Sequence, residues 1–146
     1  MKIAIGADHR GIEFKNYVIG VLKQYGHEPA DMGTHNEDAV DYPDIAGKVG
    51  GAVVEGEAKL GILICGTGIG MCIAANKVRG VRAANCVNAF MAMRARAHND
   101  ANIFCLGAEM GKAMVPAMLE AFLTTEFEGG RHQRRIEKIA SMEECG

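Results

Sequence analysis

Short apolar runs alternate with longer segments of helical period along this chain, and that alternation restricts the possible fold more than any other feature of the sequence. A strand, a helix and a second strand in succession form the repeating unit of parallel sheets whose faces are covered by helices. The clearest buried strand is expected at residues 60–65, where it runs into a glycine-rich turn and a helix that reaches Lys77. The pattern therefore predicts an α/β fold, a three-layer α/β/α sandwich with a five-stranded parallel sheet of Rossmann-like type.

The remaining elements follow from the same periodicity. Strands are expected at residues 2–6, 28–33, 60–65, 81–86 and 102–106. The second of these is expected at an edge of the sheet, because Pro29 has no N–H to donate to a neighbouring strand. Helices are expected at residues 12–25, from 41 onward, after 70 as far as 77, at 88–98, at 112–123 and from 131 onward. No repeat or linker interrupts this order, so residues 1–146 are expected to form one domain.

Composition excludes several classes of protein. Apolar residues make up 49% and charged residues 23% of the chain, a balance that favours a folded core over disorder. The formal net charge of −2 provides no overall positive potential for a nucleic-acid backbone. The five cysteines form no C-x-x-C pair and are expected to be reduced thiols. Because the sequence has neither a signal-peptide core nor an apolar run long enough to cross a bilayer, we expect a soluble cytoplasmic protein.

Reactive and polar residues lie at three predicted strand junctions. Asp8 and His9 follow the first strand, Cys65 ends the third, and His98 and Asn99 precede the fifth. Ligands of open parallel sheets bind outside the carboxyl ends of the strands, so these residues are the first candidates for a site. A simpler interpretation treats Cys65 as a small core residue and the glycines that follow it as turn formers.

Gly66, Gly68 and Gly70 form a G-x-G-x-G loop directly after Cys65, and this loop differs from better-known phosphate loops. A dinucleotide fold uses G-x-G-x-x-G with an acid at the end of the next strand, and that acid is missing here. Met71 stands where a Walker loop needs lysine and where a cysteine phosphatase needs arginine, and a response regulator needs aspartate in place of Cys65. What remains is a row of backbone N–H groups at a helix N-terminus. Such a row favours an anion and, if the sulfur faces the cleft, the Cys65 thiolate.

Arginines gather in the last predicted helix. Arg131 and Arg135 lie four residues apart, so they share one helix face and can hold a phosphate together, with Arg134 one step round. The alternative is a solvated basic surface, and RNA binding is disfavoured because no aromatic residues interleave the arginines. No spacing of cysteine, histidine and carboxylate residues resembles a ligand set, so a metal site is not expected.

Seven stretches of the chain form a specific combination. They are Gly6-Ala7-Asp8-His9, Gly33-Thr34, Asp41-Tyr42-Pro43, Ile64-Cys65-Gly66-Thr67-Gly68, Ala74-Ala75-Asn76-Lys77, His98-Asn99-Asp100-Ala101-Asn102 and Glu128-Gly129-Gly130-Arg131-His132-Gln133. With these stretches the chain resembles, over essentially its whole length, the B-type ribose-5-phosphate isomerases, a family that also contains galactose- and allose-6-phosphate isomerases. The resemblance implies interconversion of ribose 5-phosphate and ribulose 5-phosphate in pentose phosphate metabolism, without metal or other cofactor.

The resemblance also implies roles for residues. Cys65 would be the base that moves a proton between neighbouring sugar carbons through a cis-enediolate. The amides of residues 66–70 and the Asn99 side chain would stabilise the developing oxyanion, with Thr67 as a hydroxyl partner of the sugar. His98 would open the sugar ring with Asp8 nearby. Tyr42 would bind sugar hydroxyls, and the phosphate would be held by His9, Arg131 and Arg135.

Family members are dimers or larger homo-oligomers with shared active sites, so a dimer or tetramer is expected here. Many relatives carry an arginine in the turn after the fifth strand, whereas this chain has Glu109, which puts the preferred sugar phosphate in question. His98 and the Gly-Gly-Arg-His stretch favour the pentose. Isomerisation of a 6-phosphohexose remains the close alternative, and a non-catalytic nucleotide- or flavin-binding module is the alternative from another class.

Overall fold

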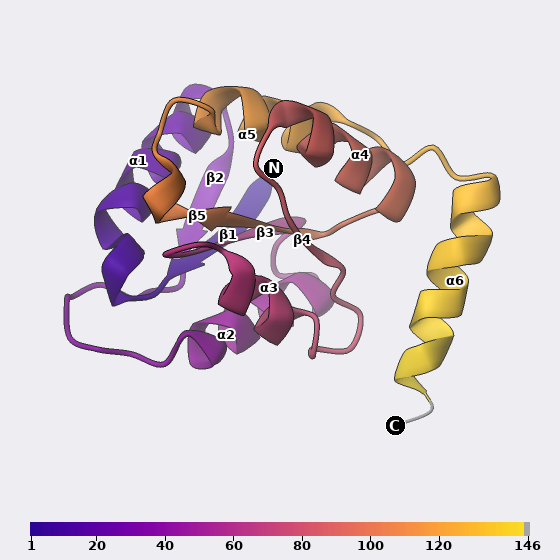
Figure 1. Ribbon diagram of the computed structural model, residues 1–146, viewed down its shortest axis with the longest axis horizontal. Helices are drawn as coiled ribbons and strands as arrows, with labels where there is room; N and C mark the ends of the chain where they lie inside the picture. Colours follow the sequence, from indigo (N-terminus) through magenta and orange to yellow (C-terminus); the bar gives the residue numbers. More distant parts are fainter. Residues whose placement is uncertain (145–146) are drawn as a thin grey trace.

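The computed structural model describes residues 1–144, and a five-stranded sheet in which every neighbouring pair is parallel forms its centre (Figure 1). The strands lie in the order β2-β1-β3-β5-β4. Their bounds are β1 Lys2–Ala7, β2 Glu28–Asp31, β3 Leu60–Cys65, β4 Ala83–Asn85 and β5 Ile103–Gly107. The predicted α/β architecture is confirmed, and the proline-containing β2 lies at an edge as expected.

Helices cover both faces of the sheet (Figure 1). One face packs against α1 (Ile12–Gln24), α4 (Ala89–Asn99) and α5 (Val115–Thr124), and the other against α2 (Tyr42–Val54) and α3 (Ile69–Ala75). Alternation along β3 divides its side chains between these two cores: Ile62 and Ile64 face the first, whereas Leu63 and Cys65 face the second. Cys65 is therefore directed toward the side of the sheet that carries α2 and α3.

Some element bounds differ from the sequence prediction. The fourth strand is shorter than expected because the Arg82 N–H donates to the Asn102 side-chain oxygen (2.8 Å) instead of a neighbouring strand. The fifth helix begins at Val115, with proline in its first turn, and not at residue 112. Two short 3-10 turns, η1 (His9–Gly11) and η2 (Ala108–Met110), follow β1 and β5 and were not predicted. Both turns shape the carboxyl edge of the sheet.

The last helix, α6 (Arg131–Glu143), lies to one side of the three layers (Figure 1). Only His132 and Ile136 of this helix are buried, whereas Ile139 is 44% and Met142 73% exposed. The C-terminal end of α6 is bound to the rest of the fold, because the Arg79 side chain donates to the backbone oxygen of Glu143 (2.7 Å). None of the described helices is long and apolar enough to span a bilayer.

Candidate active site

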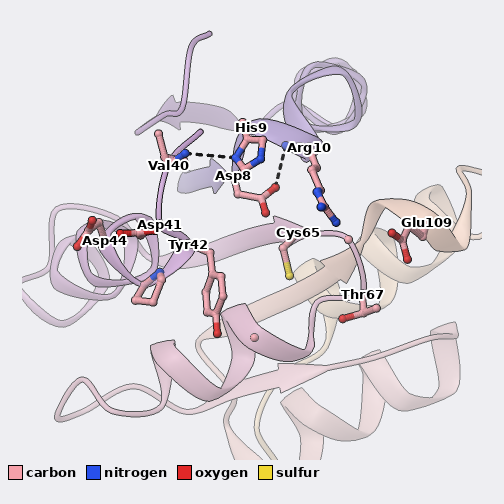
Figure 2. A pocket seen from close by; sticks show the side chains of 13 residues that line it. Asp8, His9, Arg10, Val40, Asp41, Tyr42, Asp44, Cys65, Thr67 and Glu109 are labelled. Carbon is pink, nitrogen blue, oxygen red and sulfur yellow. Dashed lines mark hydrogen bonds between the residues drawn. The ribbon is translucent and has the colours of Figure 1, made fainter. Parts of the chain in front are cut away.

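A cavity of about 670 Å³ opens at the carboxyl edge of the sheet (Figure 2). Its walls come from the turn after β1, the segment that leads into α2, the glycine loop after β3 and the turn after β5. The lining residues are Asp8, His9, Arg10, Val40, Asp41, Tyr42, Pro43, Asp44, Cys65, Gly66, Thr67, Gly70 and Glu109. The cavity thus lies where ligands of parallel sheets bind.

Two hydrogen bonds fix the turn after β1, one within the turn and one to the segment before α2. Asp8 is buried, and its carboxylate accepts the Arg10 N–H (3.1 Å), which caps η1. The Nδ1 atom of His9 accepts the Val40 N–H (3.3 Å), a bond that joins this turn to the segment before α2. Because Nδ1 is the acceptor, the neutral ring carries its proton on Nε2, which is left for a ligand.

The Cys65 sulfur faces the cavity. Cys65 ends β3 with only 6% of its surface exposed, and its Sγ accepts the Gly68 N–H at 3.2 Å. Figure 2 shows Sγ pointing into the space between the Tyr42 ring and Thr67. A backbone N–H directed at sulfur stabilises a thiolate more than a thiol, because charged acceptors form the stronger hydrogen bonds. The condition set by the sequence prediction, a sulfur that faces the cleft, is met.

Two positions of the loop require glycine, because neighbouring side chains lie too close to the backbone there for a Cβ atom. Gly68 has φ +85°, and a Cβ there would lie 2.5 Å from the Asn85 side-chain oxygen. A Cβ on Gly70 would lie 2.8 Å from the Tyr42 ring, so glycine at this position lets the ring pack against the first turn of α3. Tyr42 is thereby held at the cavity wall, as Figure 2 shows.

Five sequence-predicted residues do not line this cavity in the same chain. They are Gly68, His98, Asn99, Arg131 and Arg135. Asn99 is exposed at the end of α4, and the two arginines are exposed on the first turns of α6. The seven lining residues that the sequence singled out are Asp8, His9, Tyr42, Cys65, Gly66, Thr67 and Gly70. Gly68 does not line the cavity but donates its N–H to the Cys65 sulfur.

His98 belongs instead to a second group, which we call the α4–α6 cluster and which consists of His98, Glu128 and His132. The two rings stack with centroids 4.1 Å apart, and the Nε2 atom of each lies 3.7 Å from a Glu128 carboxylate oxygen. His132 is buried, and its Nε2 has no hydrogen-bond partner. Burial, together with the nearby His98 and Arg131 charges, lowers the pKa of His132.

Donor atoms of the α4–α6 cluster lie within 4.8 Å of one another, a spacing that the sequence reading did not anticipate. The two imidazole planes are nearly parallel, at 16°, and a metal ligated by imidazole lies in the plane of the ring. One cation cannot lie in both planes at once. This arrangement therefore favours a stacked histidine pair with Glu128 as a nearby counter-charge over a metal centre.

The cysteines other than Cys65 do not line the cavity among the described residues. Cys65, Cys72, Cys86 and Cys105 are free, as predicted, and Cys145 lies outside the described residues. A hydrogen bond from Cys105 lowers the pKa of Cys72 to about 7. Burial raises the pKa of Cys86 to about 11, and the pKa of Cys105 is raised above its usual range by its bond to Cys72 and by burial.

Sequence reasoning gave no role to several lining residues, among them Arg10, Asp41 and Asp44, and treated Glu109 only as a departure from a family pattern. Arg10 directly follows His9 at the end of a strand, and this position was the available signal. The sequence predicts a helix start at Asp41, and in the structure Asp41 is the N-cap residue of α2 and Asp44 lies in its first turn.

Comparison with known proteins now defines the class. The Ribose/Galactose Isomerase family model matches residues 3–139. The chain therefore belongs to this family, as the motifs indicated, and is a sugar phosphate isomerase.

Individual relatives cover nearly the whole chain. Ribose-5-phosphate isomerase B of Escherichia coli is 42% identical over 144 residues, which cover 98% of this chain and 97% of the relative. D-erythrulose-4-phosphate isomerase of Pectobacterium atrosepticum is 42% identical over 146 residues, with coverage of 98% and 95%. The solved structure of Clostridium thermocellum ribose-5-phosphate isomerase B has a TM-score of 0.97 and 49% identity, with 99% of each chain covered.

Proposed function

We propose that this protein interconverts D-ribose 5-phosphate and D-ribulose 5-phosphate, with its own side chains as acid and base. The observation that carries the proposal is the Cys65 Sγ, which faces the cavity and accepts the Gly68 N–H at 3.2 Å. Names of relatives support the choice of substrate, since the enzymes from E. coli and C. thermocellum are ribose-5-phosphate isomerases B. The expected setting is pentose phosphate metabolism in the cytoplasm.

In the proposed reaction, Cys65 is the base. Its thiolate takes the proton from C2 of the open-chain aldose, the C–H electron pair forms the C1–C2 double bond of a cis-enediolate, and the carbonyl electrons move to O1. The thiol then returns the proton to C1, and O2 becomes the ketone oxygen when its own proton passes to O1. Amides of the loop 66–70 stabilise the negative oxygen, with Thr67 as the hydroxyl partner and Tyr42 at the sugar hydroxyls.

Ring opening requires a second acid and base, for which we propose His98. In the same chain His98, Asn99, Arg131 and Arg135 lie outside the Cys65 cavity, so a second copy is needed to supply them. Exposed apolar side chains gather on the helices that such a copy would cover. They are Ile69 and Ile73 on α3, Phe90 and Met91 on α4, and Ile139 and Met142 on α6. We therefore propose a homo-oligomer, a dimer or tetramer, with sites shared between subunits.

In such a shared site, the arginines of one copy would bind the phosphate together with His9 of the other. Bidentate guanidinium–phosphate bonds would anchor the far end of the sugar, so that binding energy orients C1 and C2 at the sulfur. Asp8, buried under the turn, would act beside His98 during ring opening.

A different chain length of sugar is the second candidate. The relative from P. atrosepticum, equally similar at 42%, is a D-erythrulose-4-phosphate isomerase, so a change of substrate at this level of identity has occurred. The chemistry at C1 and C2 would be unchanged, and only the distance between the reacting carbons and the phosphate would differ.

A substrate panel tests the proposal. The purified protein is assayed at one enzyme concentration with ribose 5-phosphate, erythrose 4-phosphate, erythrulose 4-phosphate, allose 6-phosphate and galactose 6-phosphate, and kcat/KM is compared. We expect the highest value with ribose 5-phosphate. A higher value with another sugar phosphate would transfer the assignment to that sugar, and tight binding of FMN or NAD without turnover of any sugar would contradict the proposal.

A further inference from the structure

Among the described residues, Arg10 is the only one lining the Cys65 cavity that carries a permanent positive charge, and the sequence analysis gave it no role. It lies in η1, where the buried Asp8 accepts its backbone N–H (3.1 Å), so the backbone that presents the side chain is fixed. Figure 2 shows the guanidinium reaching from the β1 turn toward the region between Cys65 and Glu109. The Arg10 side chain therefore points into the cavity from a backbone that this hydrogen bond fixes.

The Arg10 guanidinium has no partner within residues 1–144. No carboxylate lies within 4.0 Å of it, and no hydrogen bond of its side chain is formed. By contrast, Arg82 and Arg96 both bind Asp100. An exposed arginine at a cavity wall, with no partner of its own, is suited to an anion, and a phosphate accepts two of its parallel N–H bonds.

Glu109 lines the same cavity from η2, the turn after β5. Its N–H donates to the Gly66 carbonyl (2.9 Å), and its carboxylate lies over Gly66, where a Cβ would be 3.1 Å from Oε1. Glu109 therefore places a negative charge beside the loop that would receive an anionic substrate. A phosphate at this end of the cavity needs a cation from another wall, and Arg10 is the cation that this chain provides there.

We propose that Arg10 binds the substrate phosphate in this cavity, on the same subunit as the Cys65 sulfur. This proposal rests on the proposed function for the identity of the substrate, but the anion site itself does not depend on turnover. The Glu109 charge makes phosphate binding depend more strongly on Arg10.

Binding and kinetics of an Arg10→Ala variant test the proposal. Dissociation constants for ribose 5-phosphate and for unphosphorylated ribose are measured by calorimetry, together with kcat and KM. We expect weaker binding of ribose 5-phosphate by about tenfold, a similar rise in KM, a nearly unchanged kcat and no change for ribose. Arg10→Lys, which keeps the charge but not the paired donors, should fall between wild type and Arg10→Ala.

Lys23→Ala is the matched control, because Lys23 is an exposed cation in the last turn of α1, beside the amino ends of the strands. Removing it should leave ribose 5-phosphate binding unchanged. Circular dichroism melting of each variant separates loss of the anion site from loss of the fold.

Substitutions at Glu109 provide the second arm. Glu109→Gln should tighten ribose 5-phosphate binding about two- to threefold, because a like charge near the phosphate is removed. The double variant Arg10→Ala/Glu109→Arg should recover most of the affinity lost in Arg10→Ala, because it places a guanidinium on the cavity wall formed by the turn after β5. Unchanged binding in Arg10→Ala, or a double variant that binds no better than Arg10→Ala, would overturn the proposal.

The two proposals fail separately. If wild-type protein binds ribose 5-phosphate in an Arg10-dependent way but does not isomerise it, the proposed function is wrong and the phosphate site stands. If the protein isomerises ribose 5-phosphate and Arg10→Ala is indistinguishable from wild type, the function stands and the role of Arg10 is wrong.

Discussion

The Cys65 cavity and the α4–α6 cluster are built in different ways. The cavity lies at the carboxyl edge of a buried sheet, and each wall is a short turn held by hydrogen bonds to its neighbours. The cluster of His98, Glu128 and His132 lies where the end of α4 meets the start of α6, a helix that lies to one side of the three layers. One region is complete within a single chain, whereas the other leaves apolar helix surface uncovered.

The difference indicates a division of labour in the proposed reaction. The group that needs the most exact position relative to the reacting carbons, the Cys65 sulfur, is fixed by the sheet. His98, which we propose for ring opening, and Arg131 and Arg135, which we propose as further phosphate ligands, lie near helix ends, where docking of a second copy would bring them to the cavity. Assembly would then be required for turnover but not for formation of the cavity.

Removal of the sulfur is the prediction with the largest effect. Cys65→Ala should lower kcat about a thousandfold, as expected for loss of a general base, with little change in affinity for ribose 5-phosphate. The measurement is steady-state turnover combined with calorimetry. Cys65→Ser, which is nearly isosteric, controls for repacking at this buried position, and wild-type turnover in either variant would show that the sulfur is not the base.

Mixing two inactive variants tests whether the regions meet between subunits. His98→Asn should lose most turnover of cyclic substrates and much less with sugars that are already open. When Cys65→Ala and His98→Asn proteins are unfolded, mixed equally and refolded, a dimer should regain about a quarter of wild-type activity. Half of the dimers are then mixed, and each mixed dimer holds one intact site. No recovery, with each variant refolding normally alone, would mean that Cys65 and His98 do not form a shared site.

The α4–α6 cluster should make stability depend on pH. The pKa of His132 is lowered from 6.5, chiefly by burial and then by His98, so the unfolded chain binds more protons than the folded one at mildly acidic pH. Stability is therefore full above pH 6.5 and falls as the pH drops below it toward the folded-state value. Urea unfolding at pH 7.5 and 5.5 should show this loss, and His132→Gln should reduce it. An equal loss of stability in the wild type and in His132→Gln would show that His132 is not the group responsible.

The smallest expected effect concerns the ionisation of the cysteine thiols other than Cys65. With a pKa of about 7, Cys72 is roughly half ionised at neutral pH, whereas Cys86, at about 11, is almost entirely protonated. Iodoacetamide at pH 7 should therefore modify Cys72 much faster than Cys86 or Cys105, as peptide mass spectrometry would measure. Faster labelling of Cys86 would show that the hydrogen bond between Cys72 and Cys105 does not control thiol ionisation.

Much of the cavity could be predicted from local sequence signals. A buried strand that ends in Cys65 and is followed by three alternating glycines specifies a tight strand-to-helix turn, whatever the rest of the chain does. Arg10 and Glu109 escaped a functional assignment because each lies in an ordinary turn by itself. Their significance appears only when the turns after β1 and β5 face the same cavity.

The sequence by itself determined the parallel α/β architecture, the edge position of β2 and the placement of Cys65 at a strand end, because hydrophobic period, proline and glycine act over a few residues. Tertiary structure decided the strand order, the shortening of β4 by the Asn102 side chain, and the separation of His98 from the sulfur in one chain. These features depend on contacts between segments far apart in the chain. Such contacts form only when whole faces of helices and sheet bury their apolar surface together.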